Sequence, residues 1–266
     1  MTKSGSILLV GCGKMGSALM AGWIERGTAA DTIFVVDPAG PAVPDGVRVG
    51  AGLPDVPGDF RPAVIVLAVK PQMMDDVVTP YRPLVSPDTV FLSIAAGRNI
   101  RSFENILGTE AGIVRAMPNT PAAVGRGITV LFSNTRVGPA QQQSCEALMS
   151  AVGAAAWIQD ESLMDAVTGL AGSGPAYVFY LVEAMAQAGV EAGLPADLAT
   201  QLARETVAGG GELLAQSDDS ASTLRENVTS PGGTTAAALD ILMSDDGLTR
   251  LMTRAIARAT ERSREL

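Results

Sequence analysis

Hydrophobic and polar positions follow different patterns in the two halves of the chain. Through the first half, short runs of Val, Ile, Leu and Ala contain almost no polar residue, and amphipathic segments separate several of them. Runs that are apolar throughout predict strands buried on both faces, as in a largely parallel sheet covered by helices on each side. The predicted strands are residues 6–10, 32–36, 63–69, 89–95, 112–117 and 128–132, and helices are predicted over 14–26 and 141–152.

The pattern changes near residue 160. From about Glu161 the strand-like runs end, and Ala- and Leu-rich segments with helical spacing follow one another. These segments predict helices over residues 162–170, 175–192, 196–216, 234–243 and 247–264. An α/β half followed by an all-α half indicates two domains, which we place at residues 1–160 and 161–266.

Composition and charge argue against several kinds of binding partner and against a metal site. The net charge of −9 and the pI near 4.6 argue against binding to nucleic acid or to an anionic membrane surface. The chain has no histidine, and its two cysteines, Cys12 and Cys145, have no metal-site spacing, so we expect no metal. Because the sequence shows neither a membrane-length apolar run nor a signal peptide, a cytoplasmic location is expected.

The most specific feature of the first half is a glycine motif. Gly11, Gly13 and Gly16 form G-x-G-x-x-G directly after a predicted strand and directly before a predicted helix. In such a position the first glycine permits a tight turn, the second lets the backbone approach a pyrophosphate, and the third lets the helix pack on the strand. The helix N-terminus then faces the phosphates. The first domain is therefore predicted to be a Rossmann-type dinucleotide-binding domain.

Asp37 comes directly after the second predicted strand and leaves two interpretations open. In a Rossmann domain an acid at this point binds the ribose 2′-hydroxyl and repels a 2′-phosphate, which favours NAD over NADP. Alternatively, Asp37 and Pro38 simply open a turn. No Lys or Arg follows until Arg48, so the sequence offers a 2′-phosphate little help, but the cofactor preference stays open.

Other predicted strands also end in residues suited to a ligand, because sites in open α/β sheets lie beyond the carboxyl ends of the strands. Lys70 stands between a predicted buried strand and Pro71, where a cofactor contact is a better explanation than a solvated surface charge. Ala95, Ala96 and Gly97 have side chains small enough for the close approach of a flat nicotinamide.

One segment of the helical half is unusual. The stretch NVTSPGGTTAAALDIL, residues 227–242, interrupts the helices with Ser-Pro-Gly-Gly-Thr-Thr. A helix–helix turn needs only the proline and one glycine. The turn therefore explains the backbone and leaves Asn227, the paired glycines and the two threonines without a role.

These motifs together resemble one family. From about residue 6 to the C-terminus the chain is similar to pyrroline-5-carboxylate reductases in six motifs, which are GCGKMG, LAVKPQ, SIAAG, RAMPNTPAAVGRG, DAVTGLAGSGPAYVF and LRENVTSPGGTTAAAL. The resemblance implies reduction of 1-pyrroline-5-carboxylate to L-proline, the last step of proline biosynthesis, with a hydride from NADPH or NADH. It also implies a Rossmann domain followed by a helical dimerisation domain, in a homodimer or a larger homo-oligomer such as a decamer.

Carried over position by position, the resemblance implies a role for each candidate residue. On the cofactor side these are Gly11, Cys12, Gly13, Lys14, Met15 and Gly16 at the pyrophosphate, Asp37 at the adenosine ribose, and Ala68, Val69, Lys70, Pro71, Ala95, Ala96 and Gly97 along the nicotinamide. On the substrate side these are Glu161, Asn227, Gly232, Gly233, Thr234 and Thr235. Thr235 matches the threonine whose hydroxyl approaches the imine nitrogen, and is therefore the candidate catalytic residue.

Two positions depart from the family pattern, and two other functions compete with it. The family commonly favours NADPH, against which Asp37 argues, and it often has an asparagine where Asp55 stands here. Both departures leave the choice between NAD and NADP open. A reductase of 2-keto or 3-hydroxy acids usually employs a lysine of its helical domain, and this chain has none after Lys70. A nucleotide-binding sensor without catalysis would have no need for the hydroxyl of Thr235.

Overall fold

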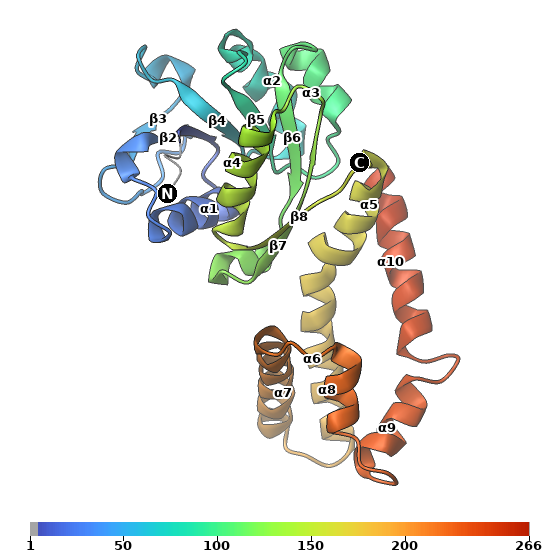
Figure 1. Ribbon diagram of the computed structural model, residues 1–266. Helices are drawn as coiled ribbons and strands as arrows, with labels where there is room; N and C mark the ends of the chain where they lie inside the picture. The colour runs from blue at the N-terminus through green and yellow to red at the C-terminus, as the bar shows by residue number, and fades with distance from the viewer. Residues whose placement is uncertain (1–4, 266) are drawn as a thin grey trace. The chain divides into compact units, whose positions relative to one another are not determined.

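The computed structural model describes residues 5–265, which form two compact units. Unit 1 comprises the residues up to Gly172 together with the end of the last helix from Ala259 onward, and unit 2 is Ser173–Arg258. The strands belong to unit 1, and unit 2 is built of helices (Figure 1).

Within residues 5–265, unit 1 contains an eight-stranded sheet in the order β3-β2-β1-β4-β5-β6-β7-β8. The strands are β1 (Ser6–Val10), β2 (Ile33–Val36), β3 (Arg48–Gly50), β4 (Pro62–Leu67), β5 (Val90–Ser93), β6 (Gly112–Met117), β7 (Gly127–Ser133) and β8 (Gly153–Trp157). Neighbouring strands are parallel except β6 and β7, which run antiparallel. The chain builds β2 and β3 on one side of β1 and then crosses to β4 on the other side. Such a reversal of strand order is where open α/β sheets bind ligands.

Helices cover both faces of the sheet because successive strand residues point to opposite faces. Ile7 and Leu9 of β1 share a core with α1 and α4, whereas Leu8 and Val10 share a second core with α2 and α3. The helices of unit 1 are α1 (Lys14–Glu25), α2 (Met74–Val78), α3 (Ile100–Leu107), α4 (Pro139–Ser150) and α5 (Met164–Val167), with 3-10 turns η1 (Ala30–Thr32), η2 (Leu53–Asp55), η3 (Pro71–Met73), η4 (Thr79–Leu84), η5 (Thr120–Val124) and η6 (Glu161–Leu163) and a π-helical turn η7 (Thr168–Gly172).

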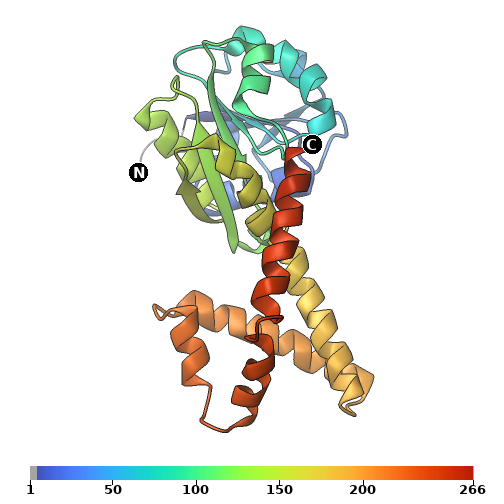
Figure 2. The ribbon, with the colours of Figure 1, turned by 90° about the vertical axis from the view of Figure 1, so that its right-hand side faces the viewer.

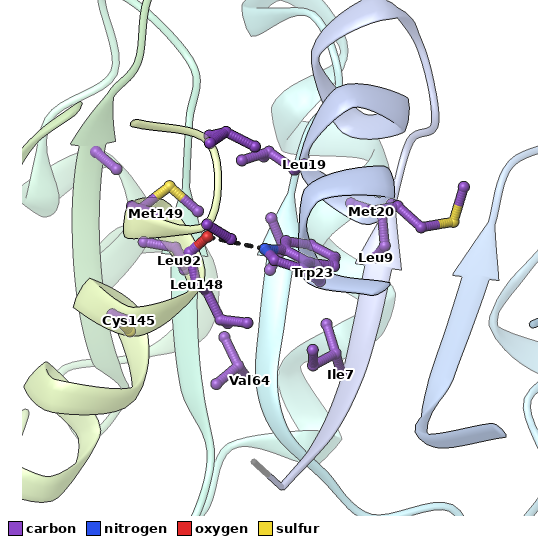
Figure 3. Packing of buried hydrophobic residues seen from close by; sticks show 14 of the residues in the cluster. Ile7, Leu9, Leu19, Met20, Trp23, Val64, Leu92, Cys145, Leu148 and Met149 are labelled. Atoms are coloured by element: carbon purple, nitrogen blue, oxygen red, sulfur yellow. Dashed lines mark hydrogen bonds between the residues drawn. The ribbon is translucent and has the colours of Figure 1, made fainter. Parts of the chain in front are cut away.

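Trp23 of α1 is the largest side chain in the first of these cores (Figure 3). It is 1% exposed, and its indole Nε1 donates a hydrogen bond of 2.9 Å to the carbonyl oxygen of Leu148 in α4. The polar atom of the indole is thereby satisfied within the core, as a buried tryptophan requires. This contact joins the helix of the glycine motif to α4.

The predicted fold class is confirmed, with a Rossmann-type sheet followed by helices, and all six predicted strands are present. The hydrophobic pattern misses β3 and β8. β3 has three residues, begins with the exposed Arg48 and lies at the sheet edge. β8 has the sequence GAAAW, and alanine has a low preference for strands. The predicted helix over 162–170 is divided among η6, α5 and η7.

Unit 2 comprises α6 (Gly174–Glu191), α7 (Ala196–Gln216), α8 (Ala221–Asn227), α9 (Thr234–Leu242) and most of α10 (Leu248–Arg264). The helices α6 and α7 lie side by side (Figure 1), and a Cβ atom at Gly189 would be 3.2 Å from that of Ala199. Yet none of the residues of α6, all of which the structure describes, is buried. Phe179 and Tyr180 are 63% and 69% exposed. Unit 2 therefore leaves large apolar side chains uncovered on a helix whose composition suits a buried position.

Candidate active site

Three of the predicted cofactor segments lie at one edge of the sheet. The N–H of Ala68 donates to the carbonyl oxygen of Val10 at 2.7 Å, so the segment after β4 lies beside the end of β1. The N–H of Ile94 donates to the carbonyl oxygen of Leu67 at 3.1 Å, so the segment after β5 lies beside the end of β4. The structure therefore places the glycine motif, residues 68–71 and residues 95–97 next to one another, at the point where strand order reverses.

Each glycine of the motif has a separate geometric requirement. Gly11 has φ +90°, and a Cβ atom there would lie 2.8 Å from the carbonyl oxygen of Ala68. A Cβ atom at Gly16 would lie 2.5 Å from the carbonyl oxygen of Gly11, so α1 can approach β1 only without a side chain. At Gly13 a Cβ atom would meet nothing within 4 Å. Gly13 is also the N-cap of α1, and among the described residues no side chain caps the N–H groups of the first turn. This arrangement fits a pyrophosphate.

The other three residues of the motif differ in burial. Cys12 is 8% exposed, Lys14 is exposed at the first position of α1, and Met15 packs partly against the first core. Lys14 is thus the residue of the three that offers a positive charge at the start of the helix.

Asp37 follows β2 and holds the glycine turn through its carboxylate. The N–H of Cys12 donates to Oδ2 at 2.8 Å, and the N–H of Ala39 donates to Oδ1 at 2.9 Å. Burial and, secondly, the nearby Asp37 carboxylate raise the pKa of the Cys12 thiol. The acid at the predicted ribose position is therefore fixed in orientation by two backbone donors.

The two segments on the predicted nicotinamide side differ in character. Lys70 is exposed and lies directly before η3, which begins at Pro71. Ala95 is 5% exposed, and Gly97 has φ +72°. Arg98, the next residue, forms an ion pair with Asp75 of α2 and so anchors the end of this segment.

Glu161 lies in unit 1, and its carboxylate is engaged there. Its Oε1 accepts hydrogen bonds from the N–H of Ile100 at 2.8 Å and from Nη1 of Arg115 at 3.2 Å. Arg115 belongs to β6, and its side chain is only 7% exposed. Glu161 thereby links the first residue of α3, just after residues 95–97, to the middle of the sheet. Sequence reasoning missed Arg115, although a single arginine within the apolar run GIVRAM was a signal that could have found it.

The remaining predicted substrate residues gather in unit 2, around the turn between α8 and α9 (Figure 2). Asn227 is the last residue of α8. Gly232 has φ +68°, which favours glycine, and Gly233 is the N-cap of α9 without a side-chain cap among the described residues. Thr234 and Thr235 begin the helix, so their N–H groups belong to its first turn.

The hydroxyl group of Thr235 differs from those of most other helical threonines. Thr200 of α7 and Thr253 of α10 donate to carbonyl oxygens four residues earlier, at 2.9 and 2.8 Å. The hydroxyl group of Thr235, by contrast, has no hydrogen-bond partner within residues 5–265, and the residue is half-buried. The start of α9 thus combines uncapped N–H groups with a hydroxyl group that is available to a ligand.

Comparison with known proteins shows to which family the chain belongs. A family model described as pyrroline-5-carboxylate reductase dimerisation matches residues 161–266. The pyrroline-5-carboxylate reductase of Pseudomonas aeruginosa is 38% identical, and the alignment covers 98% of this chain and 96% of that protein. The one from Synechocystis is 39% identical, with 97% of each chain covered. The chain belongs to the pyrroline-5-carboxylate reductase family.

Solved structures of pyrroline-5-carboxylate reductases have the same fold. The enzyme from Coxiella burnetii superposes with a TM-score of 0.90 at 33% identity, covering 98% of both chains. The enzyme from Plasmodium falciparum, solved with NADP bound, has a TM-score of 0.81 at 30% identity and covers 100% of this chain and 99% of its own. The predicted family is therefore confirmed over the whole length of the chain.

Other features of this pyrroline-5-carboxylate reductase family member lie outside the candidate residues. Cys145 in α4 is fully buried, and burial raises the pKa of its thiol to about 12. Within the described residues, no group of three His, Cys, Asp or Glu side chains is arranged to hold a metal ion. None of the described helices combines the length and the apolar character needed to cross a membrane.

Proposed function

We propose that this protein reduces the C=N bond of 1-pyrroline-5-carboxylate with NADH or NADPH and releases L-proline. Membership of the pyrroline-5-carboxylate reductase family supports the proposal. The observation that carries it is the start of α9, where, among residues 5–265, the first N–H groups have no side-chain cap and the hydroxyl group of Thr235 has no hydrogen-bond partner. A helix N-terminus suits a substrate carboxylate, and a hydroxyl group suits an imine nitrogen.

For the cofactor, we propose the carboxyl edge of the sheet in unit 1. Gly13 and the first turn of α1 bind the pyrophosphate there, because the space at Gly13 is open and the N–H groups are uncapped. Lys14 adds a positive charge, and Asp37 binds the adenosine ribose. Residues 68–71 and 95–97 line the nicotinamide, and the reduced ring, when bound, supplies the hydride.

Unit 2 supplies the proposed substrate contacts. Gly232, Gly233 and Thr234 bind the carboxylate, and Asn227 contributes its side-chain amide. The hydride adds to the imine carbon while the ring nitrogen takes up or retains a proton, and Thr235 hydrogen-bonds this nitrogen and orients the C=N bond. Orientation and hydrogen bonding account for this chemistry, so a chain without histidine can perform it. A substrate role for Glu161 remains a prediction, because the observed contacts of its carboxylate are with Ile100 and Arg115.

The uncovered helices support a proposed homo-oligomer. The exposed Phe179 and Tyr180 of α6 suit an apolar interface with a second copy, and residues 161–266 match a dimerisation model. We propose a homodimer or a higher homo-oligomer such as a decamer. We also propose that the dinucleotide-binding domain ends at residue 160 and that residues 161–266 form the helical dimerisation and substrate domain. Light scattering on the purified protein checks this assembly, and a monomer at micromolar concentration contradicts it. The two buried thiols support a reducing, cytoplasmic location.

Oxidation of NADH and of NADPH, followed by absorbance, tests the proposed reaction. With 1-pyrroline-5-carboxylate added, turnover with at least one nucleotide is expected. With a 2-keto acid in its place, no turnover is expected, because the helical half contains no lysine to act as the acid. Turnover of the keto acid and none of the imine contradicts the proposal.

A further inference from the structure

The ribose end of the proposed cofactor site carries two carboxylates, and neither forms an ion pair with a cation in the part of the chain that the structure describes. Asp37 follows β2 there, and the neighbouring Asp55 accepts hydrogen bonds from the N–H groups of Ala51 and Gly52 at 2.7 and 3.1 Å, just after β3. Because β2 and β3 are parallel, both carboxylates lie toward the same edge of the sheet.

Two arginines close to Asp37 and Asp55 in the sequence, Arg48 and Arg61, lie at the opposite edge of the sheet. Arg48 begins β3, and its guanidinium lies over the rings of Phe34 and Phe60 at 5.7 and 5.1 Å from their centroids. It also donates to the carbonyl oxygen of Asp31 at 3.3 Å. Arg61 precedes β4 and donates to the carbonyl oxygen of Phe60 at 3.3 Å. Both therefore lie at the amino ends of their strands, away from the ribose.

The carboxylate of Asp37 cannot turn aside without a cost. Its two oxygens accept from the N–H groups of Cys12 and Ala39, and Cys12 is buried in the glycine turn. Rotation would leave the N–H of Cys12 without its acceptor, and an unsatisfied buried donor is destabilising. Each carboxylate oxygen still has a lone pair for a ribose hydroxyl. The fixed carboxylate can thus accept from a 2′-hydroxyl but meets a 2′-phosphate as a like charge.

We propose that this chain selects NADH over NADPH and that Asp37 is the residue that determines the choice. The inference rests on the proposed cofactor site and specifies which nucleotide it takes. In its choice of nucleotide this chain would then differ from the Plasmodium falciparum relative, which was solved with NADP bound. A protein with a 2′-phosphate site would place a cation at the end of β2, where this chain has an acid that is already hydrogen-bonded.

The test is the dissociation constant of each nucleotide, measured by fluorescence of the reduced nicotinamide with no imine present. For the full-length protein we expect NADH to bind roughly 100-fold more tightly than NADPH. In Asp37→Asn, which keeps one carbonyl acceptor and removes the charge, the ratio should fall by at least about tenfold. Asp45→Asn is the control, because Asp45 is an exposed acid before β3, at the opposite edge, and its replacement changes the net charge equally. This control should keep the wild-type ratio.

Each other outcome has a defined meaning. Equal or tighter binding of NADPH by the wild-type protein overturns the inference and leaves the proposed reaction intact. A wild-type preference for NADH that Asp37→Asn and Asp37→Ser both retain, while still folded, overturns the assignment to Asp37. If neither nucleotide binds and no imine is reduced, the proposed function itself fails. The wild-type ratio decides the preference even where a variant does not fold.

Discussion

Replacement of Gly13 by alanine should weaken dinucleotide binding and leave the fold intact. Gly13 has φ −70° and ψ −166°, a conformation that alanine adopts without strain, and a Cβ atom there meets nothing within 4 Å. The added methyl group would occupy the space at the start of α1, where we propose that the pyrophosphate binds. The substitution thus perturbs the proposed pyrophosphate site and no packing contact.

The magnitude follows from the contacts that the methyl group would prevent. A hydrogen bond between a backbone N–H and a charged phosphate contributes about 1.5–3 kcal/mol. Loss of one such bond raises the dissociation constant of NADH about 10- to 100-fold. Stability should change by about 1 kcal/mol or less, because alanine is a poorer N-cap than glycine, and its restriction of the unfolded chain offsets part of that loss.

Gly16→Ala is the matched comparison within the same motif. Its Cβ atom would lie 2.5 Å from the carbonyl oxygen of Gly11, so the backbone of the turn or α1 must move. Overpacking of this kind costs about 1–3 kcal/mol and should lower Tm by several degrees. Gly13→Ala should leave Tm nearly unchanged and lose affinity, whereas Gly16→Ala should lose both.

Thermal unfolding and nucleotide fluorescence titration on the two variants give the required numbers. Wild-type affinity of Gly13→Ala for NADH refutes the proposed pyrophosphate position. A large fall in its Tm would contradict the reading that the space at Gly13 is free of protein contacts.

Three further predictions concern other parts of the molecule. Cys145 should make the protein less stable in alkali, because burial raises the pKa of its thiol from 9.0 to about 12 and the thiol therefore ionises first in the unfolded chain. Between these pH values the free energy of unfolding should fall by about 1.4 kcal/mol per pH unit, and denaturant titrations of Cys145→Ala should lack this slope. Glu161→Gln should destabilise the protein by about 2 kcal/mol in the same titrations, because Arg115 loses its counter-charge. This value is smaller than that for a fully buried pair because the Glu161 side chain is 25% exposed, and unchanged stability would show that the pair contributes nothing. Thr235→Ala should lower kcat for the imine at least about tenfold, and Thr235→Ser should restore most of it, whereas wild-type kcat in Thr235→Ala would remove the role given to this hydroxyl group.

The strands with continuous apolar runs can be predicted from the sequence, and for β1 the predicted bounds, residues 6–10, are the observed ones. β3 escaped prediction because its position depends on pairing with β2 rather than on its own composition. α8 is missed for a different reason, because it is a short polar helix whose local cap at Ser220 does not appear in a pattern of apolar runs. Continuous apolar runs therefore reveal the central strands, and they do not reveal short elements that depend on strand pairing or on a cap.

The candidate site, too, has parts that the sequence reveals and parts that only the structure reveals. The glycine motif and the Gly-Gly-Thr-Thr turn were visible in the sequence, since each needs particular residues in consecutive positions. The contacts of Asp37 with Cys12 and of Glu161 with Arg115 join residues far apart in the chain, and no spacing rule reveals them. They become visible only once the strand order is known.

The most direct test of the proposed reaction follows the transferred hydrogen. The protein is incubated with 1-pyrroline-5-carboxylate and a reduced nicotinamide nucleotide deuterated at C4 on the transferred face, and the product is examined by mass spectrometry and NMR. We predict L-proline with a single deuterium at C5, the former imine carbon. Recovery of unreacted imine, or of proline without deuterium, would contradict hydride transfer to the imine and with it the proposed function.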